Sequence, residues 1–116
     1  MSKEDNLDLR YSMTVKVFKE SHVFGPGIVE ILKLVDQNQS LTASYKTMGL
    51  SSSKGWKIIK RAEEDLGFKL IESSTGGKGG GHSALTEEGR NILNRYNSFI
   101  RELNIEADKI FKKHFK

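Results

Sequence analysis

Residues 40–86 decide the fold, and they read SLTASYKTMGLSSSKGWKIIKRAEEDLGFKLIESSTGGKGGGHSALT. Ser40 can cap a short helix over residues 41–48, because its hydroxyl can accept a hydrogen bond from a free N–H group of the first turn. Gly49 is expected to end this helix, since a residue without a Cβ atom enters the left-handed conformation at little cost.

A second helix is expected over residues 52–66, with Ser51 or Ser52 as its cap and Gly67 just after its end. Two short helices joined by a tight turn that contains glycine are typical of a helix-turn-helix. In that motif the second helix enters the DNA major groove, with its N-terminal residues nearest the base edges.

The spacing of apolar residues predicts which side of the second helix is buried. Ile59, Ala62 and Leu66 recur at intervals of three or four residues and should face the core. Gly55 is costly inside a helix, so we expect the first helix to approach it closely. Trp56 fits either the core or the boundary between protein and DNA.

The start of the second helix has a chemistry that suits DNA. It carries hydroxyls and cations and no acid before Glu63, and such groups, like the free N–H groups of a helix N-terminus, favour phosphates. The competing interpretation is an ordinary solvated amphipathic helix. The candidate DNA-binding residues here are Ser51, Ser52, Ser53, Lys54, Lys57, Lys60 and Arg61.

A wing is predicted after this helix, with strands over residues 69–73 and 84–86. The connecting loop is too rich in glycine to pack a core, and its backbone could approach a phosphate with Lys78 as the charge. The candidate DNA-binding residues of the loop are Gly77, Lys78 and Gly79. A nucleotide-binding loop would need Ser or Thr after the lysine, and Gly79 stands there. A loop without any partner is the other alternative.

Before the motif, residues 1–8 are expected to be disordered. Residues 10–19 alternate and are rich in β-branched and aromatic side chains, which predicts a strand, and residues 22–24 are its expected partner. Gly25-Pro26 should open a helix, because proline suits the first helical position. The expected core side of that helix comprises Ile28, Ile31, Leu32 and Val35.

After the wing, Thr86 should cap a long helix that runs to about residue 113. A helix of that length has an apolar side that a small domain cannot cover, so pairing with a second chain is expected. The alternative is a helix that folds back as part of the core. Ile105 lies off the apolar side. The candidate dimerisation residues are Leu93, Tyr96, Ile100, Leu103, Ala107 and Ile110.

Composition sets limits on function. The chain has 116 residues, 36% of them hydrophobic, a net charge of +4 and a pI near 9.3, which are compatible with one small domain that binds nucleic acid. It has no cysteine, no apolar run of roughly 20 residues and no visible signal peptide, so the cytoplasm is the expected location. His22, His82 and His114 lack metal-ligand spacing. No catalytic pair stands out, and neither an enzyme nor a cofactor is expected.

Several motifs together resemble the DNA-binding domain of the ModE family of molybdate-responsive regulators, which is related to the winged-helix head of LysR-type regulators. The resemblance covers about residues 13–100. It implies a winged-helix dimer that binds operator DNA and regulates transcription. The residues that carry it are Gly25-Pro26-Gly27, Ser40-Leu41, Met48-Gly49-Leu50-Ser51, Trp56, Thr75-Gly76-Gly77-Lys78-Gly79-Gly80-Gly81, Leu85-Thr86 and Gly89.

Two departures from the family pattern stand out. Ser44 and Tyr45 occupy the first motif helix where small residues are usual, and Gly55 could make room for them. The molybdate-binding domain that follows the head in ModE proteins is absent from these 116 residues. Molybdate or another oxyanion is therefore not expected to bind this chain, which looks like a stand-alone head.

The expected fold is mainly α with a little β: a winged helix-turn-helix over residues 9–86, begun by a β-hairpin, and a dimerisation helix over residues 87–116. The expected function is a homodimeric transcriptional regulator that binds a two-fold site on double-stranded DNA and no membrane. One alternative is a protein-interaction module that pairs with a separate sensor chain. The other is an anion or nucleotide binder that uses the glycine-rich loop.

Overall fold

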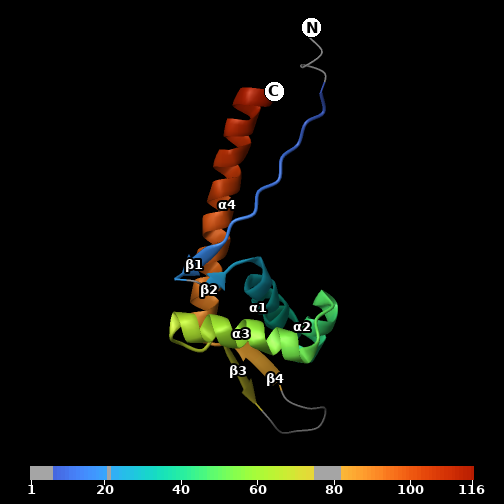
Figure 1. The fold of residues 1–116 in the computed structure, drawn as a ribbon, viewed down its shortest axis with the longest axis vertical. Coiled ribbons are helices and arrows are strands. Elements are labelled where there is room, and N and C mark those ends of the chain that lie inside the picture. Colours follow the sequence, from blue (N-terminus) through green and yellow to red (C-terminus); the bar gives the residue numbers. More distant parts are fainter. Residues whose placement is uncertain (1–6, 21, 75–81) are drawn as a thin grey trace.

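The computed structural model describes residues 7–20, 22–74 and 82–116. This part of the chain is mainly helical with two short hairpins, as expected (Figure 1). The elements in chain order are β1 (Val17–Lys19), β2 (His22–Phe24), α1 (Pro26–Asn38), α2 (Leu41–Met48), α3 (Ser52–Leu66), β3 (Ile71–Ser74), β4 (His82–Leu85) and α4 (Glu87–Phe115).

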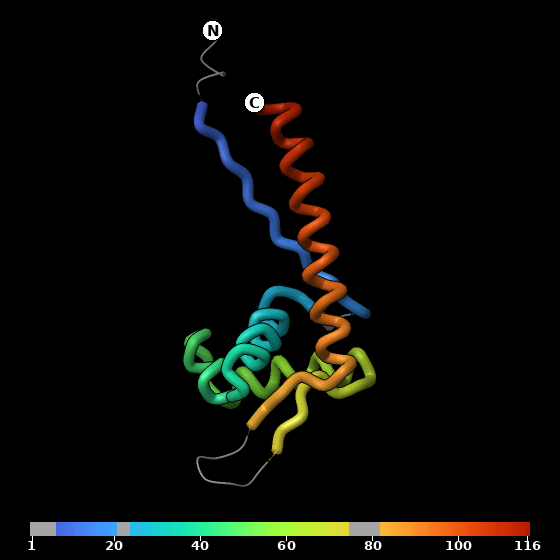
Figure 2. The backbone as a smooth tube through the Cα atoms, turned by 180° about the vertical axis from the view of Figure 1, so that it is seen from behind, coloured from blue at the N-terminus to red at the C-terminus, as the bar shows by residue number. Residues whose placement is uncertain are grey.

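The molecule is elongated, measuring 67 × 29 × 22 Å along its principal axes. The first three helices and the two hairpins form a head, and α4 rises out of it (Figure 1). Strands β3 and β4 project from the opposite end of the head, and the N-terminal segment of residues 7–16 runs along α4 in both views (Figures 1 and 2). The wing and the free end of α4 therefore point in opposite directions.

Helix α1 is the centre of the core. Its predicted core residues Ile28, Ile31, Leu32 and Val35 are all buried, and the last three are 0% exposed. Pro26 occupies the start of this helix after Gly25, as expected. The other helices of the head and the start of α4 pack around α1, so the core is shared by the whole head.

The predicted caps are confirmed, because they depend on local sequence. The Ser40 hydroxyl accepts from the N–H of Ala43 at 3.1 Å, and the Ser51 hydroxyl accepts from the N–H of Lys54 at 3.2 Å. Gly49 and Gly67 end α2 and α3 in the left-handed conformation, with φ of 70° and 84°. The two motif helices therefore begin and end where the sequence predicts.

The prediction of a strand over residues 10–19 is wrong for most of its length. Only Val17–Lys19 pairs, and its partner is His22–Phe24. Residues 10–16 contact a helix instead of a strand: the Tyr11 hydroxyl donates to the Asp108 carboxylate, and the Val15 carbonyl accepts from the Tyr96 hydroxyl at 3.0 Å. An alternating pattern indicates an extended chain but does not say which surface that chain meets. Residues 1–6, where disorder was expected, lie outside the described residues.

The wing strands are confirmed with shifted ends. They cover Ile71–Ser74 and His82–Leu85, and the register pairs Ile71 with Leu85. Both of these residues are buried; the rest of β3 is exposed, whereas β4 alternates between exposed and buried residues. Residues 75–81, the glycine-rich loop, lie outside the described residues.

The segment Leu85-Thr86-x-x-Gly89 joins the wing to α4. Thr86 caps α4 by accepting from the N–H of Gly89 at 2.9 Å, and its hydroxyl donates to the Lys69 carbonyl at 2.6 Å. A Cβ atom at Gly89 would lie 2.3 Å from the Leu70 carbonyl oxygen. The segment therefore holds the start of α4 against the start of the wing, and only glycine fits at position 89.

An ion pair fixes the same end of α4 to α1. The Arg90 guanidinium donates to both carboxylate oxygens of Asp36, at 2.7 and 3.3 Å. The hydrogen bond and the charge of Asp36 raise the pKa of Arg90. Because both side chains are largely exposed, the pair orients α4 more than it stabilises the fold.

Candidate nucleic-acid interface

The crossing of α2 and α3 sets the position of the whole candidate surface. Tyr45 is buried at this crossing, and a Cβ atom at Gly55 would lie 2.2 Å from its ring. The predicted close approach at Gly55 is therefore confirmed, and it is the absence of a side chain there that accommodates Tyr45. Ser44 is fully buried and donates to the Ser40 carbonyl at 2.7 Å.

The Tyr45 hydroxyl has no hydrogen-bond partner within the described part of the chain. Burial raises the pKa of Tyr45, because the charged phenolate would lose its hydration. Tyr45 therefore acts as an aromatic spacer between the two motif helices.

The first turn of α3 presents the predicted polar residues to solvent. Ser52, Ser53 and Lys54 are exposed, whereas the Ser51 hydroxyl is already engaged as the cap. The N-terminal N–H groups of a helix that have no partner within it favour an anion. The first turn of α3 can therefore receive a phosphate or a base edge, with Ser51 in a structural role.

Lys57 and Arg61 lie one turn apart on α3, and both are exposed. Residues on the opposite side of the helix are buried: Ile59 is 1% exposed and Ala62 is 4% exposed. Leu66, the third predicted core residue, is partly buried against the same core. The helix therefore offers solvent a continuous basic side.

Lys60 differs from the other cations of α3, because its side chain already has two partners. Its ammonium lies 3.4 Å from a carboxylate oxygen of Glu63 and 4.3 Å from the centre of the Trp56 ring. The Trp56 side chain is 49% exposed, which decides the ambiguity left by the sequence in favour of the surface. Lys60 and Trp56 therefore form one exposed unit on the flank of α3.

Glu63 is a site residue that the sequence analysis does not single out. Acidic residues are mostly exposed in proteins, yet Glu63 is only 9% exposed. Its carboxylate accepts from the N–H of Leu70 at 2.8 Å and from the N–H of Ile71 at 3.4 Å. Glu63 therefore ties α3 to the first strand of the wing. The only signal in the sequence is its place one residue after Ala62, on the buried side.

The wing is anchored to the head from its second strand. Ser83 is buried, its N–H donates to the Gln39 carbonyl at 3.0 Å, and its hydroxyl lies 3.1 Å from that of Ser73. The three candidate residues of the loop, Gly77, Lys78 and Gly79, lie outside the described residues. The structure thus brings α3 and the base of the wing together and leaves the loop as a prediction.

The candidate dimerisation residues do not share one environment. Leu93 is 5% exposed in the core, and Tyr96 is partly buried by Phe24 and by the N-terminal segment. Farther along α4, Ile110 is 57% exposed. Between these ends, Ile100, Leu103 and Ala107 are half-buried.

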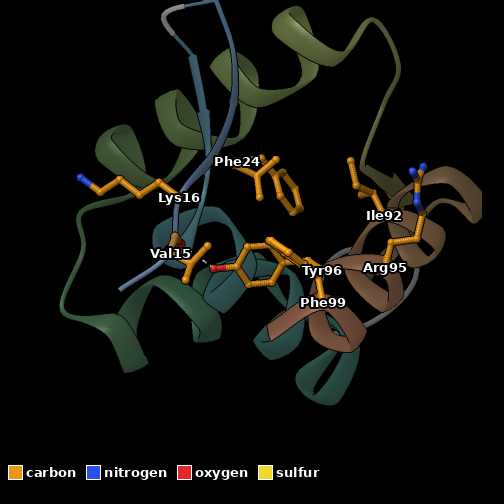
Figure 3. A pocket seen from close by; sticks show the side chains of 8 residues that line it. Val15, Lys16, Phe24, Ile92, Arg95, Tyr96 and Phe99 are labelled. Atoms are coloured by element: carbon orange, nitrogen blue, oxygen red, sulfur yellow. Dashed lines mark hydrogen bonds between the residues drawn. The ribbon is translucent and has the colours of Figure 1, made fainter. Parts of the chain in front are cut away.

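An open groove of about 480 Å³ lies where the N-terminal segment meets α4 (Figure 3). Phe24, Ile92 and Tyr96 give it an apolar wall, while the charged ends of Lys16 and Arg95 point away from it. Phe99, which is 45% exposed, borders the groove. The groove therefore continues the exposed apolar side of α4 down to the head.

Two other classes of site were sought in the described residues. Within residues 7–20, 22–74 and 82–116, no group of three or more His, Cys, Asp or Glu side chains is placed to hold a metal ion. No helix in these ranges is both long and apolar enough to cross a membrane.

Comparison with known proteins identifies the family. The pattern of the family described as "Bacterial regulatory helix-turn-helix protein, lysR family" matches residues 28–90, which run from α1 to the start of α4. The chain belongs to this LysR family of regulators. The basic side of α3 and the wing described above lie within the matched residues.

Comparison with individual proteins also agrees with the expected resemblance to ModE. The chain is 31% identical over 71 residues to the DNA-binding transcriptional dual regulator ModE of Escherichia coli K12, which covers 61% of this chain and 27% of the relative. It is 28% identical over 89 residues to the transcriptional regulator ModE of Haemophilus influenzae, covering 77% of this chain and 34% of that protein.

A third relative is the molybdenum-pterin-binding protein MopB of Rhodobacter capsulatus, which is 23% identical over 99 residues, or 76% of this chain and 37% of the relative. The match to this LysR-family chain thus spans well under half the length of each of these three relatives.

Proposed function

We propose that this LysR-family chain regulates transcription by placing α3 in the major groove of an operator. The observation that carries the proposal is the basic side of α3, where Lys54, Lys57 and Arg61 are exposed beside the wing. The first two turns of the helix present hydroxyls, cations and the exposed Trp56 to solvent but no acid, and the first acid, Glu63, is turned inward. Such a surface attracts the phosphate backbone and can reach base edges.

The fold supports this orientation. The N-terminus of α3 and the base of the wing lie at the end of the head that is distant from the free end of α4 (Figure 1). A duplex can therefore meet α3 and the wing without touching α4. The loop residues Gly77, Lys78 and Gly79 lie in the sequence between β3 and β4 and are proposed to touch the DNA backbone.

We infer that two copies of the chain pair through α4. Phe99, Leu103 and Ile110 recur on one side of this helix, and Phe99 and Ile110 are 45% and 57% exposed. Apolar side chains repeated along an exposed helix favour burial against a second copy. In a two-fold dimer the two α3 helices would meet major grooves about 34 Å apart.

The alternative occupant of this side of α4 is a different protein, such as a separate sensor chain. The similarity to regulators that are named for binding DNA favours the DNA-binding function. Since the match covers 27% of the E. coli relative, the rest of that relative's activity, including any effector binding, is not carried over. We propose a cytoplasmic protein that performs no catalysis and binds no oxyanion through residues 1–116.

Three single substitutions test the assignment of the surface: Lys54→Ala, Lys57→Ala and Lys78→Ala. Each should lower the affinity for duplex DNA and reduce the dependence of affinity on salt by about one released ion per lysine. Lys112→Ala on α4 is the matched control, because Lys112 is exposed but lies in the last turn of α4. Unchanged affinity and salt dependence in all three variants would show that the DNA surface lies elsewhere.

A further inference from the structure

A groove of about 240 Å³ separates α3 from the first strand of the wing, and no function has been assigned to it. Trp56 and Lys60 of α3 line one side, and Lys69 and Ser73 line the other. We propose that this groove holds the sugar-phosphate strand of the duplex that passes between α3 and the wing, with Trp56 in contact with it. The proposal rests on the proposed DNA-binding function and adds a site to it.

The path of the DNA follows from the shape of a duplex. The major groove is separated from the adjacent minor groove by one sugar-phosphate strand. If α3 occupies the major groove and the wing reaches the adjacent minor groove, that strand must cross the gap between them. In this structure the gap is the groove between α3 and β3.

Trp56 has the chemistry for this contact. It follows Gly55, which is buried against Tyr45, so its own indole is directed to the edge of the groove and is 49% exposed. An exposed tryptophan suits a contact with DNA, because it presents a large apolar area and one N–H donor. A deoxyribose can cover the ring, and a phosphate oxygen can accept from the N–H group.

Lys60 is held in place for the same contact. The Trp56 ring at 4.3 Å and the Glu63 carboxylate at 3.4 Å fix its ammonium at the groove, where a cation can meet a phosphate. Glu63 is already engaged by the N–H groups of Leu70, just before β3, and Ile71, its first residue, so its charge is largely satisfied. The remaining charged groups of the groove are Lys69, which would attract a phosphate, and the exposed Glu72, which would repel it.

The first test uses fluorescence, because Trp56 is the only tryptophan of the chain. Its emission should change when the protein is saturated with duplex DNA. Trp56→Ala should weaken binding about tenfold, and Trp56→Phe should retain part of the affinity, since phenylalanine keeps the ring but loses the donor. The loss should be equal for an operator duplex and a shuffled duplex, because backbone contacts carry no sequence information.

The second test uses charge. Lys69→Ala should weaken binding, whereas Glu72→Gln should strengthen it, and both changes should shrink as salt rises. Phe18→Ala is the matched control for loss of an exposed aromatic side chain, because Phe18 is 65% exposed on β1, away from the wing (Figure 1). This control should bind DNA like the wild-type protein.

The outcomes separate this inference from the proposed function. If the wild-type protein binds DNA and Lys57→Ala weakens it, but the Trp56 emission stays constant and Trp56→Ala binds normally, the inference is wrong and the function stands. A loss confined to the operator duplex would also overturn it, because Trp56 would then read bases. If the wild-type protein binds no duplex, the function fails and the inference fails with it.

Discussion

At the scale of single residues, two glycines set the distances between elements because they lack a side chain. Gly55 lets α2 cross α3 over the Tyr45 ring, and Gly89 lets α4 begin against the Leu70 carbonyl. Both positions follow from the same cause, which is that a Cβ atom would overlap an atom of the neighbouring element. A side chain at Gly55 would therefore displace α2 from α3, and one at Gly89 would displace the start of α4 from Leu70.

Gly89→Ala should therefore destabilise the fold. The new Cβ atom would lie 2.3 Å from a backbone oxygen, and backbone cannot swing away as a side chain can. We expect a loss of about 1–3 kcal/mol in the free energy of unfolding, although alanine alone favours a helix. Gly27→Ala is the control, since nothing lies within 4 Å of its Cβ position, and it should be neutral or stabilising. Urea unfolding of the two variants measures both values.

Glu63 should be far more important to stability than the neighbouring Glu64. Glu63→Gln keeps one acceptor for the N–H groups of Leu70 and Ile71 but loses the charge that strengthens them. We expect a loss of about 1–3 kcal/mol in the free energy of unfolding. Glu64→Gln, at an exposed position, should change it by less than about 0.5 kcal/mol. Equal effects of the two substitutions would contradict the buried role of Glu63.

Tyr45 should make the fold sensitive to alkali. Burial raises the pKa of its hydroxyl above the value of 10.0 that applies in the unfolded chain. Below pH 10 both states hold the proton and stability is unaffected; above it the unfolded state loses the proton first, so stability falls until the folded pKa is passed. The melting temperature of the Tyr45→Phe variant should fall less steeply than that of the wild-type protein between pH 9 and 11. A steeper fall in the variant would contradict this cause.

At the scale of elements, local signals predicted the helices well. The caps Ser40, Ser51 and Thr86 act within three residues of themselves, so the starts of α2, α3 and α4 could be read directly from the sequence. The extended segment of residues 10–16 could not be placed in this way. Its partner is Tyr96 and the end of α4, about 80 to 100 residues away, and alternation alone does not distinguish a helix surface from a strand.

The candidate DNA-binding site could likewise be predicted only where it depends on local sequence. The exposed cations Lys54, Lys57 and Arg61 follow from the period of the helix, which also predicts the buried side at Ile59. The roles of Glu63 and Trp56 depend on where β3 lies beside α3, and that distance is a tertiary property. The sequence therefore predicted which side of α3 is free, but not the groove on its flank.

The pairing of α4 can be tested on its exposed apolar side. Ile110→Asp places a charge where we expect contact with a second copy, so it should convert the dimer to a monomer. Asn94→Asp adds the same charge at an exposed position close to the head and should leave the dimer intact. Sedimentation equilibrium of both variants and the wild-type protein measures this. A wild-type monomer would contradict the pairing and favour a different partner for α4.

At the scale of the whole molecule, the two surfaces that we propose for binding lie toward opposite ends of the 67 Å long axis. Helix α3 and the wing strands lie at one end, and the free end of α4 lies at the other (Figures 1 and 2). DNA and a second copy can therefore bind at the same time without competing for a surface. Pairing would double the number of lysine contacts on one operator, which raises affinity and its dependence on salt together.

Fluorescence anisotropy with a duplex from the gene's own upstream region and a shuffled duplex, at several salt concentrations, tests the proposed function most directly. We predict that the upstream duplex binds about 10³-fold more tightly or better, and that both affinities fall steeply as salt rises. Equal affinities would contradict sequence-specific regulation by this chain alone. Absence of binding to either duplex at low salt would contradict the assignment of α3 as a DNA-binding helix.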